Sequence, residues 1–258
     1  MNILVTGANG FVGKHLCLAL QFAGHQVSAS TSRDLDITKP FKMSGHYDYV
    51  FHLAAYNITS VGDQNEAMYE RVNVQGTKHV LEGIASDHFV FLSTSRIYEH
   101  SLSGYAKSKL AAESICQEYF KGKGLIILRS ANILGKGQAP KAVLPVFLER
   151  AMQNQALVIM GNPALSMTYV DVRDIVELSM AILKHSQCRG VYNVAYPKSV
   201  TLKELALKVI AATHSSSTIN QSAPEAPSSI EHMDCQRTWD DFGFMPQHDI
   251  DQIIESII

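Results

Sequence analysis

The chain has 258 residues, enough to bury the core of one large α/β domain, with or without a small appendage. Its 22 Lys and Arg against 24 Asp and Glu give a formal charge of −2, which excludes a broad basic surface for nucleic acid or an anionic membrane. The four cysteines have no zinc-type or C-x-x-C spacing, so we expect reduced thiols, no metal site and a cytoplasmic protein. We expect neither a signal peptide nor a membrane span, because no apolar run approaches about 18 residues.

Short apolar runs alternate with helical patterns through the first half of the chain. This alternation predicts parallel strands covered by helices on both faces. The expected fold class is therefore α/β, a Rossmann-type doubly wound parallel sheet with a small C-terminal substrate-binding cap. The expected strands are 3–5, 26–29, 49–53, 89–92 and 125–128, and the expected helices are 11–23, 65–85 and 105–119.

A glycine-rich turn follows the first expected strand directly and precedes the first helix. Gly7 permits a tight turn, Gly10 allows the backbone to approach a pyrophosphate, and Gly13 lets the helix pack closely on the strand. The anion would lie at the positive end of the helix. The pattern predicts a dinucleotide site formed by Gly7, Asn9, Gly10, Phe11, Val12 and Gly13.

The end of the second strand bears on which dinucleotide binds. Thr31 stands where an NAD-specific site places a carboxylate for the ribose 2′-hydroxyl. Arg33 and Ser32 offer donors to a 2′-phosphate instead, which predicts NADP as the preferred cofactor, with NAD possible. Two alternatives remain open: Asp34 turns toward the ribose, or Arg33 and Asp34 form only a solvated pair.

Hydroxyl groups and a lysine follow the strand at 89–92. Tyr105 and Lys109 are four residues apart and share one face of a helix, where the ammonium would favour phenolate and lower the pKa of the tyrosine. Thr94 follows the strand end and would donate to a substrate oxygen, unless it only satisfies its own turn. We expect Tyr105, Lys109 and Thr94 to be catalytic, with Tyr105 transferring the proton.

The second half of the chain has a different pattern, with helices near 140–154, 171–184 and 201–213 separated by short strands at 157–160 and 191–194. A dinucleotide-binding domain is expected over 1–160. A smaller, mainly substrate-binding region is expected over 161–258, interleaved with the first because the segments 165–185 and 191–194 can return to the main domain. Residues 214–230 are rich in Ser, Pro and Ala, which predicts an exposed loop or a mobile segment.

Taken together, these motifs resemble the extended short-chain dehydrogenase/reductase family, which comprises sugar-nucleotide epimerases, dehydratases and 4-keto-reductases. Further matching segments are His52–Ala55, Val72–Thr77, Arg129–Gly135 and Tyr169–Val172. The resemblance implies that Lys109 also holds the nicotinamide ribose and that Asn132 meets substrate, although Asn132 can also be a loop residue that bonds backbone. It further implies adenine contacts from Asp36 and Ile37, and a cofactor cleft lined by Leu53, Ala54 and Ala55.

The same resemblance implies a homodimer formed by the helices at 65–85 and 105–119. Met68, Val72, Leu110 and Ile115 would supply apolar contacts, unless they face the core of their own subunit.

Three departures from the family pattern narrow the range of reactions and substrates that we expect. Dehydratases of this group carry Asp and Glu after the threonine, whereas Ser95 and Arg96 stand here, which disfavours dehydration. The segment 98–105 is short, and Leu165 stands where many relatives place an arginine on the nucleotide diphosphate.

The leading hypothesis is hydride transfer at a carbinol or carbonyl carbon of a sugar, with net reduction or epimerisation as the outcome. The family resemblance implies that this sugar is linked to a nucleotide. The alternatives are reduction of a small non-nucleotide carbonyl compound, and a redox-sensing NADP-binding protein without turnover.

Overall fold

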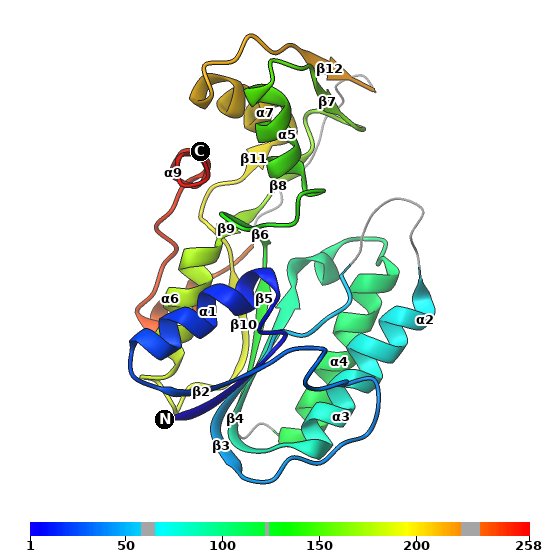
Figure 1. Cartoon of the computed structure of the whole chain (residues 1–258), viewed down its shortest axis with the longest axis vertical. Helices are drawn as coiled ribbons and strands as arrows, with labels where there is room; N and C mark the ends of the chain where they lie inside the picture. The colour runs from blue at the N-terminus through cyan, green and yellow to red at the C-terminus, as the bar shows by residue number, and fades with distance from the viewer. Residues whose placement is uncertain (58–64, 122–123, 223–232) are drawn as a thin grey trace. The chain divides into compact units, whose positions relative to one another are not determined.

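The computed structural model describes residues 1–57, 65–121, 124–222 and 233–258. The chain forms two compact units (Figure 1). Unit 1 consists of Met1–Ser130, Val176–Asn193 and Cys235–Phe244, and unit 2 consists of Ala131–Ile175, Val194–Asp234 and Met245–Ile258.

A six-stranded sheet forms the centre of unit 1, in the order β10-β5-β4-β3-β1-β2. The four pairings that join β2, β1, β3, β4 and β5 are parallel, so these carboxyl ends lie at one edge of the sheet. The strand order reverses between β1 and β3, and open α/β sheets bind ligands in the crevice at such a point. The strands are β1 (Asn2–Thr6), β2 (Gln26–Ser30), β3 (His46–His52), β4 (Ala85–Thr94), β5 (Leu125–Ser130) and β10 (Gly190–Val194).

Helices cover both faces of this sheet (Figure 1), as the doubly wound prediction requires. The core strands are continuous apolar runs, such as Ile3–Val5 and Phe89–Phe91, because both of their faces are buried. The helices and helical turns of unit 1 are α1 (Phe11–Phe22), α2 (Glu66–Met68), η1 (Tyr69–Gln75), α3 (Gly76–Gly83), η2 (Ser95–Tyr98), α4 (Gly104–Phe120), the second part of α6 (Val172–Ile182) and α8 (Gln236–Phe242).

The helix expected over 65–85 contains a π-helical segment, η1, between α2 and α3. A wider turn of this kind inserts an extra residue and is frequent at functional sites. Asn73 lies in η1 and is buried, and its side chain reaches both Tyr56 and Ser108. The apolar pattern predicted the helix but not the wider turn, since both have nearly the same spacing of buried positions.

Unit 2 is built around its own apolar cluster, to which Phe147, Leu205 and Ile253 contribute. Both α7 and α9 begin with a capping box, at Thr201 and Asp249 respectively. The elements of unit 2 are β6 (Asn132–Leu134), α5 (Val143–Met152), β7 (Leu157–Ile159), β8 (Ser166–Met167), β9 (Tyr169–Asp171), β11 (Val200–Thr201), α7 (Leu202–Ala212), β12 (Ile219–Gln221) and α9 (Ile250–Glu255), with the first residues of α6.

The expected loop over 214–230 is wrong in one part. Residues Ile219–Gln221 form β12, which pairs in parallel with β7 through Ile219 and Leu157. The composition concealed this strand because it is only three residues long and its two polar residues are exposed. Residues 223–230 of the expected loop lie outside the described residues. In the described parts of the chain, no helix has both the length and the apolar character that a membrane span requires.

Candidate active site

The three glycines of the turn after β1 form a tight cradle at the carboxyl edge of the sheet. Gly7 has φ +71°, and a Cβ there would lie 2.7 Å from the backbone nitrogen of Ala54. A Cβ on Gly13 would overlap the carbonyl oxygen of Gly7. Gly10 caps α1 without a side-chain hydrogen bond, so the first amides of the helix keep their capacity to bind an anion. The cradle therefore fits a dinucleotide pyrophosphate.

The other residues expected in this turn differ in exposure. Asn9 is exposed and Phe11 is half-buried, with its ring at 5.8 Å from that of His15. Val12 is buried on the inner face of α1. Asn9 and Phe11 are thus at the surface of the turn, whereas Val12 supports α1 from beneath.

The segment after β2 forms a turn that holds its own carboxylate. Asp34 Oδ2 accepts hydrogen bonds from Thr31 N at 3.1 Å and from Thr31 Oγ1 at 2.6 Å. These bonds, and secondarily the charge of Arg33, lower the pKa of Asp34. Ser32 and Arg33 are exposed at the tip of the turn.

Asp36 and Ile37 follow in the same loop. Asp36 Oδ1 accepts from the backbone and hydroxyl of Thr38, at 3.0 and 2.6 Å. Ile37 is buried, and its carbonyl oxygen bonds with the imidazole of His79 on α3 at 2.9 Å. The loop is thereby fastened to α3.

A buried chain of hydrogen bonds runs from β1 to the helix that carries Tyr105. Thr77 donates to the carbonyl oxygen of Asn73 at 2.6 Å, so its oxygen accepts from His52 Nε2, at 3.0 Å. His52 Nδ1 is then the acceptor for the Thr6 hydroxyl, at 2.6 Å. Asn73 donates to Ser108 Oγ, which itself donates to the carbonyl oxygen of Tyr105.

His52 is uncharged in this chain of hydrogen bonds. Its burial, and secondarily the positive charge of Lys109, lower the pKa of His52 to about 3. A neutral ring with its proton on Nε2 satisfies both neighbouring hydroxyls, whereas an imidazolium would leave Thr6 without an acceptor. This chain of hydrogen bonds therefore fixes the positions of β3, η1 and α4 relative to one another.

Thr94 is the last residue of β4 and is buried. Its Oγ1 accepts a hydrogen bond from Arg96 N at 3.3 Å, which begins the short helix η2. The turn thus uses a lone pair of the hydroxyl and does not use its proton. Thr94 can serve its own turn and still donate to a substrate oxygen.

Tyr105 and Lys109 lie in the first turns of α4, which starts beside the end of β4. The ring of Tyr105 is 6.1 Å from that of Tyr69 on η1. Lys109 is 2% exposed, and its Nζ lies 3.9 Å from the centre of the Phe91 ring on β4. Topology therefore brings Thr94, Tyr105 and Lys109 to the same edge of the sheet as the glycine cradle.

The pKa of Tyr105 differs from the sequence-based expectation. Burial raises the pKa of Tyr105 to about 12, and Arg96 opposes this rise. Burial also lowers the pKa of Lys109 to about 8, while Cys116 and Glu113 act in the opposite direction. In the protein alone, loss of solvent raises the pKa of the phenol more than Arg96 lowers it, and a lowering by Lys109 together with a bound nicotinamide ring stays a prediction.

Two groups near the site have roles that were not expected from the sequence. Arg96 lies close enough to Tyr105 to favour its phenolate, and it pairs with Glu99 at 3.7 Å. Glu113, one turn beyond Lys109 on α4, is buried and binds Arg129 at 2.7 Å. The spacing of four residues between Tyr105, Lys109 and Glu113 in the sequence could have indicated that Glu113 shares their helical face.

Asn132 belongs to unit 2, at the start of β6. Its side-chain amide donates to the carbonyl oxygen of Thr168 at 3.0 Å. This bond agrees with the alternative that Asn132 is a loop residue whose side chain bonds to backbone. The expected contact with substrate stays a prediction.

Comparison with known proteins identifies the chain. The model of the NAD dependent epimerase/dehydratase family matches residues 3–195, about three quarters of the sequence. The chain belongs to this family. Within the family, it is 27% identical over 236 residues to GDP-6-deoxy-D-mannose reductase of Pseudomonas aeruginosa, covering 79% of this chain and 77% of the relative. It is also 24% identical over 255 residues to human dTDP-D-glucose 4,6-dehydratase, covering 81% and 73%.

Solved structures of family members have the same fold. RMD from Pseudomonas aeruginosa complexed with NADPH gives a TM-score of 0.81 at 23% identity, over 99% of this chain and 97% of that one. UDP-glucuronic acid 4-epimerase from Bacillus cereus, in complex with UDP-glucuronic acid and NAD, gives 0.82 at 22% identity with the same coverage. The Rossmann-type fold predicted from the sequence is confirmed.

Proposed function

We propose that this protein transfers hydride at a carbinol or carbonyl carbon of a nucleotide-linked sugar, with Tyr105 as the proton-transfer group. The observation that supports the proposal is that Thr94 ends β4 and that Tyr105 and Lys109 lie in the first turns of the helix that follows, on the sheet whose β1 leads into the glycine cradle. A bound nicotinamide supplies or accepts the hydride. In reduction, Tyr105 gives its proton to the new alkoxide and Thr94 donates a hydrogen bond to the same oxygen.

The raised pKa of Tyr105 fits this direction of the reaction. A phenol with a pKa of about 12 is fully protonated at neutral pH and is ready to donate. Lys109, one helical turn from Tyr105 on α4, would add positive charge that stabilises the phenolate remaining after the transfer. The same residues serve an epimerase, which retains its cofactor, and a reductase, which exchanges it in each cycle.

The test is an assay of the purified protein with GDP-, dTDP- and UDP-linked sugars and their 4-keto derivatives. Absorbance of the reduced nicotinamide reports net reduction, and separation of the sugar products reports epimerisation. We expect turnover with at least one sugar nucleotide. Binding of NADPH without turnover across the panel would contradict the proposal and favour the redox-sensing alternative. Including dTDP-D-glucose checks the further proposal that Ser95 and Arg96 make dehydration unfavourable.

A second candidate is reduction of a small carbonyl compound that carries no nucleotide. Only residues 99–103 separate η2 from α4, and Leu165 is 51% exposed at the position where many relatives have the diphosphate-binding arginine. A panel of simple aldehydes and ketones tests this candidate in the same assay.

We also propose that NADP(H) is preferred over NAD(H). The support is the turn at 31–34, in which Thr31 engages the Asp34 carboxylate and Arg33 is exposed at the tip. A guanidinium at this position can pair with a 2′-phosphate.

The cofactor preference is tested with Arg33→Ala and, as a matched control, Lys39→Ala, which removes an exposed cation from the same loop. We expect Arg33→Ala to weaken NADPH binding by about tenfold or more and to leave NADH binding nearly unchanged. Equal affinity of the unmodified protein for NADPH and NADH would refute the preference. The preference would also be refuted if Lys39→Ala weakened NADPH binding as much as Arg33→Ala does.

A further inference from the structure

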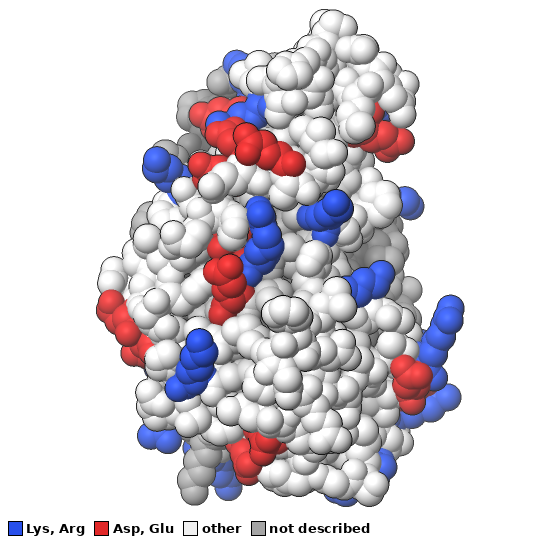
Figure 2. Space-filling view, turned by 60° about the vertical axis from the view of Figure 1, so that its left-hand side comes forward, with Lys and Arg blue, Asp and Glu red and all other residues white. Residues whose placement is uncertain are grey.

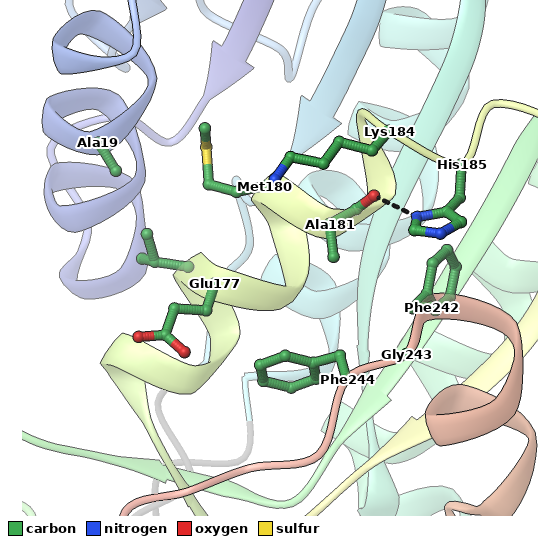
Figure 3. A pocket seen from close by; sticks show the side chains of 10 residues that line it. Ala19, Glu177, Met180, Ala181, Lys184, His185, Phe242, Gly243 and Phe244 are labelled. Atoms are coloured by element: carbon green, nitrogen blue, oxygen red, sulfur yellow. Dashed lines mark hydrogen bonds between the residues drawn. The ribbon is translucent and has the colours of Figure 1, made fainter.

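Unit 1 has an apolar groove on the face of the sheet opposite the one covered by α4. The groove lies along α6 and has a volume of about 520 Å³. In Figure 3, Ala19 of α1 stands on one side of α6, and Phe242, Gly243 and Phe244 stand on the other. Met180 lies between them, and His185 holds the end of α6 through a 2.9 Å bond to the carbonyl oxygen of Ala181.

The wall formed by α1 exposes apolar side chains beside this groove. Phe22 is 97% exposed and Leu18 is 68% exposed. Phe22 is four residues from Leu18 and three from Ala19 along the helix, so its side chain neighbours both on the surface of α1. Figure 2 brings forward the side of the molecule that carries α1 and α6, and its surface in unit 1 is mostly uncharged. Apolar surface gathered in this way marks a binding surface more often than scattered single residues do.

Two opposite charges occupy the ends of the groove. Glu177 and Lys184 are both exposed and line it. Glu177 lies in the middle of α6 and Lys184 lies two residues beyond its end. They are seven positions apart, about 10 Å at the rise of a helix, which is too far for them to pair with each other. A face that carries an acidic group and a basic group at this separation is complementary to its own antiparallel copy, because each charge then faces its opposite.

We propose that this face binds a second copy of the chain about a twofold axis that crosses α6 at Met180 and Ala181. The two α6 helices run antiparallel, so that Glu177 of each protomer faces Lys184 of its partner. An axis perpendicular to α6 in the plane of the contact leaves its two sides in place, so α1 of one protomer faces α1 of the other. The exposed side chains Leu18 and Phe22 then extend the apolar contact between the two α1 helices. The interface is isologous, since one patch serves both partners.

The test measures the mass of the full-length protein by sedimentation over a range of concentrations. Glu177→Lys and Lys184→Glu each place like charges opposite each other, and we expect each to weaken self-association by about tenfold. The double reversal Glu177→Lys/Lys184→Glu exchanges the charges and is expected to restore the association. Phe22→Ser should weaken association through lost apolar contact. Glu149→Lys makes the same charge change on α5 of unit 2 and is expected to leave the mass unchanged.

Restoration by the double reversal supports the proposal, because a change in the stability of α6 alone would add up in the double variant. A double variant that associates as weakly as either single variant overturns it. So does an unmodified protein that stays monomeric throughout the range, which would assign the groove to a different partner. Association that is indifferent to all of these substitutions places the contact on another face and also overturns it.

Discussion

Tyr105 and Lys109 have pKa values displaced in opposite directions by a common cause. Burial disfavours whichever form is charged, so it raises the pKa of the phenol to about 12 and lowers that of the ammonium to about 8. The spacing of the two residues was sufficient to predict that they lie one turn apart on the same helix. Their pKa values were not predictable from spacing, because they depend on desolvation by residues distant in sequence, such as Phe91 and Tyr69.

The hydroxyl of Tyr105 can be tested by its removal. Tyr105→Phe deletes one oxygen atom from a packed ring, so we expect the fold and the cofactor affinity to persist while turnover falls by about 100-fold or more. Steady-state kinetics and cofactor titration measure the two effects. Tyr119→Phe removes the hydroxyl of an exposed tyrosine on the same helix and serves as the control. Near-normal turnover of Tyr105→Phe on a proven substrate would refute its assigned role.

The charge of Lys109 predicts a pH dependence. The ammonium is present below its pKa of about 8 and is lost as the pH rises through that value. If Lys109 holds the cofactor, NADPH affinity should therefore decrease above about pH 8. Lys109→Met replaces the cation with an uncharged side chain of similar length, so we expect weaker binding that no longer changes in this range. Binding measured by fluorescence across pH tests both proteins, and parallel pH profiles would contradict the role of Lys109.

At the scale of elements, the glycine cradle was predictable because strand, turn and helix follow one another without interruption. The π-helical segment was not, since a single extra residue in a turn scarcely alters an apolar pattern. The short helices α8 and α9 were also missed. Seven and six residues give too few repeats of a helical period to be recognised.

Gly13 of the cradle can be compared with Gly24, which follows α1. Gly13→Ala would press a methyl group against the Gly7 carbonyl, whereas Gly24→Ala meets no atom within 4 Å and adds only the strain of its φ of +81°. We expect Gly24→Ala to cost about 1 kcal/mol of stability without affecting the cofactor. Gly13→Ala should cost more and should also weaken cofactor binding. Thermal unfolding with and without NADPH separates the two effects, and equal loss of NADPH stabilisation in both variants would contradict this account.

At the scale of the whole molecule, the helices at 65–85 and 105–119 cover one face of the sheet, while α1 and α6 lie on the other (Figure 1). The family resemblance assigns the first face to a four-helix dimer contact. Val72 and Ile115 are partly buried against the core of their own unit, whereas Leu110 is 38% exposed on α4. Leu110 is therefore the better probe of this contact.

Leu110→Glu should dissociate the four-helix contact, because it places a charge in an apolar interface. The protein loses one association step, and its mass at a given concentration falls by about half. Light scattering measures this change. Because the two faces are separate, the two contacts can be tested independently of each other. An unchanged mass for Leu110→Glu would count against the four-helix contact and leave the α6 face unaffected.

The interleaving of the two units has a consequence for biosynthesis. Unit 1 includes β10 and α8, and its last segment ends at Phe244, close to the end of the chain. Domains commonly fold as they leave the ribosome, with the N-terminal one first. Here a nascent chain that stops after Ser130 has the glycine cradle and Tyr105 but lacks the sixth strand of its sheet. Unit 1 is therefore completed only after residue 244 has been synthesised, when most of unit 2 has already been made.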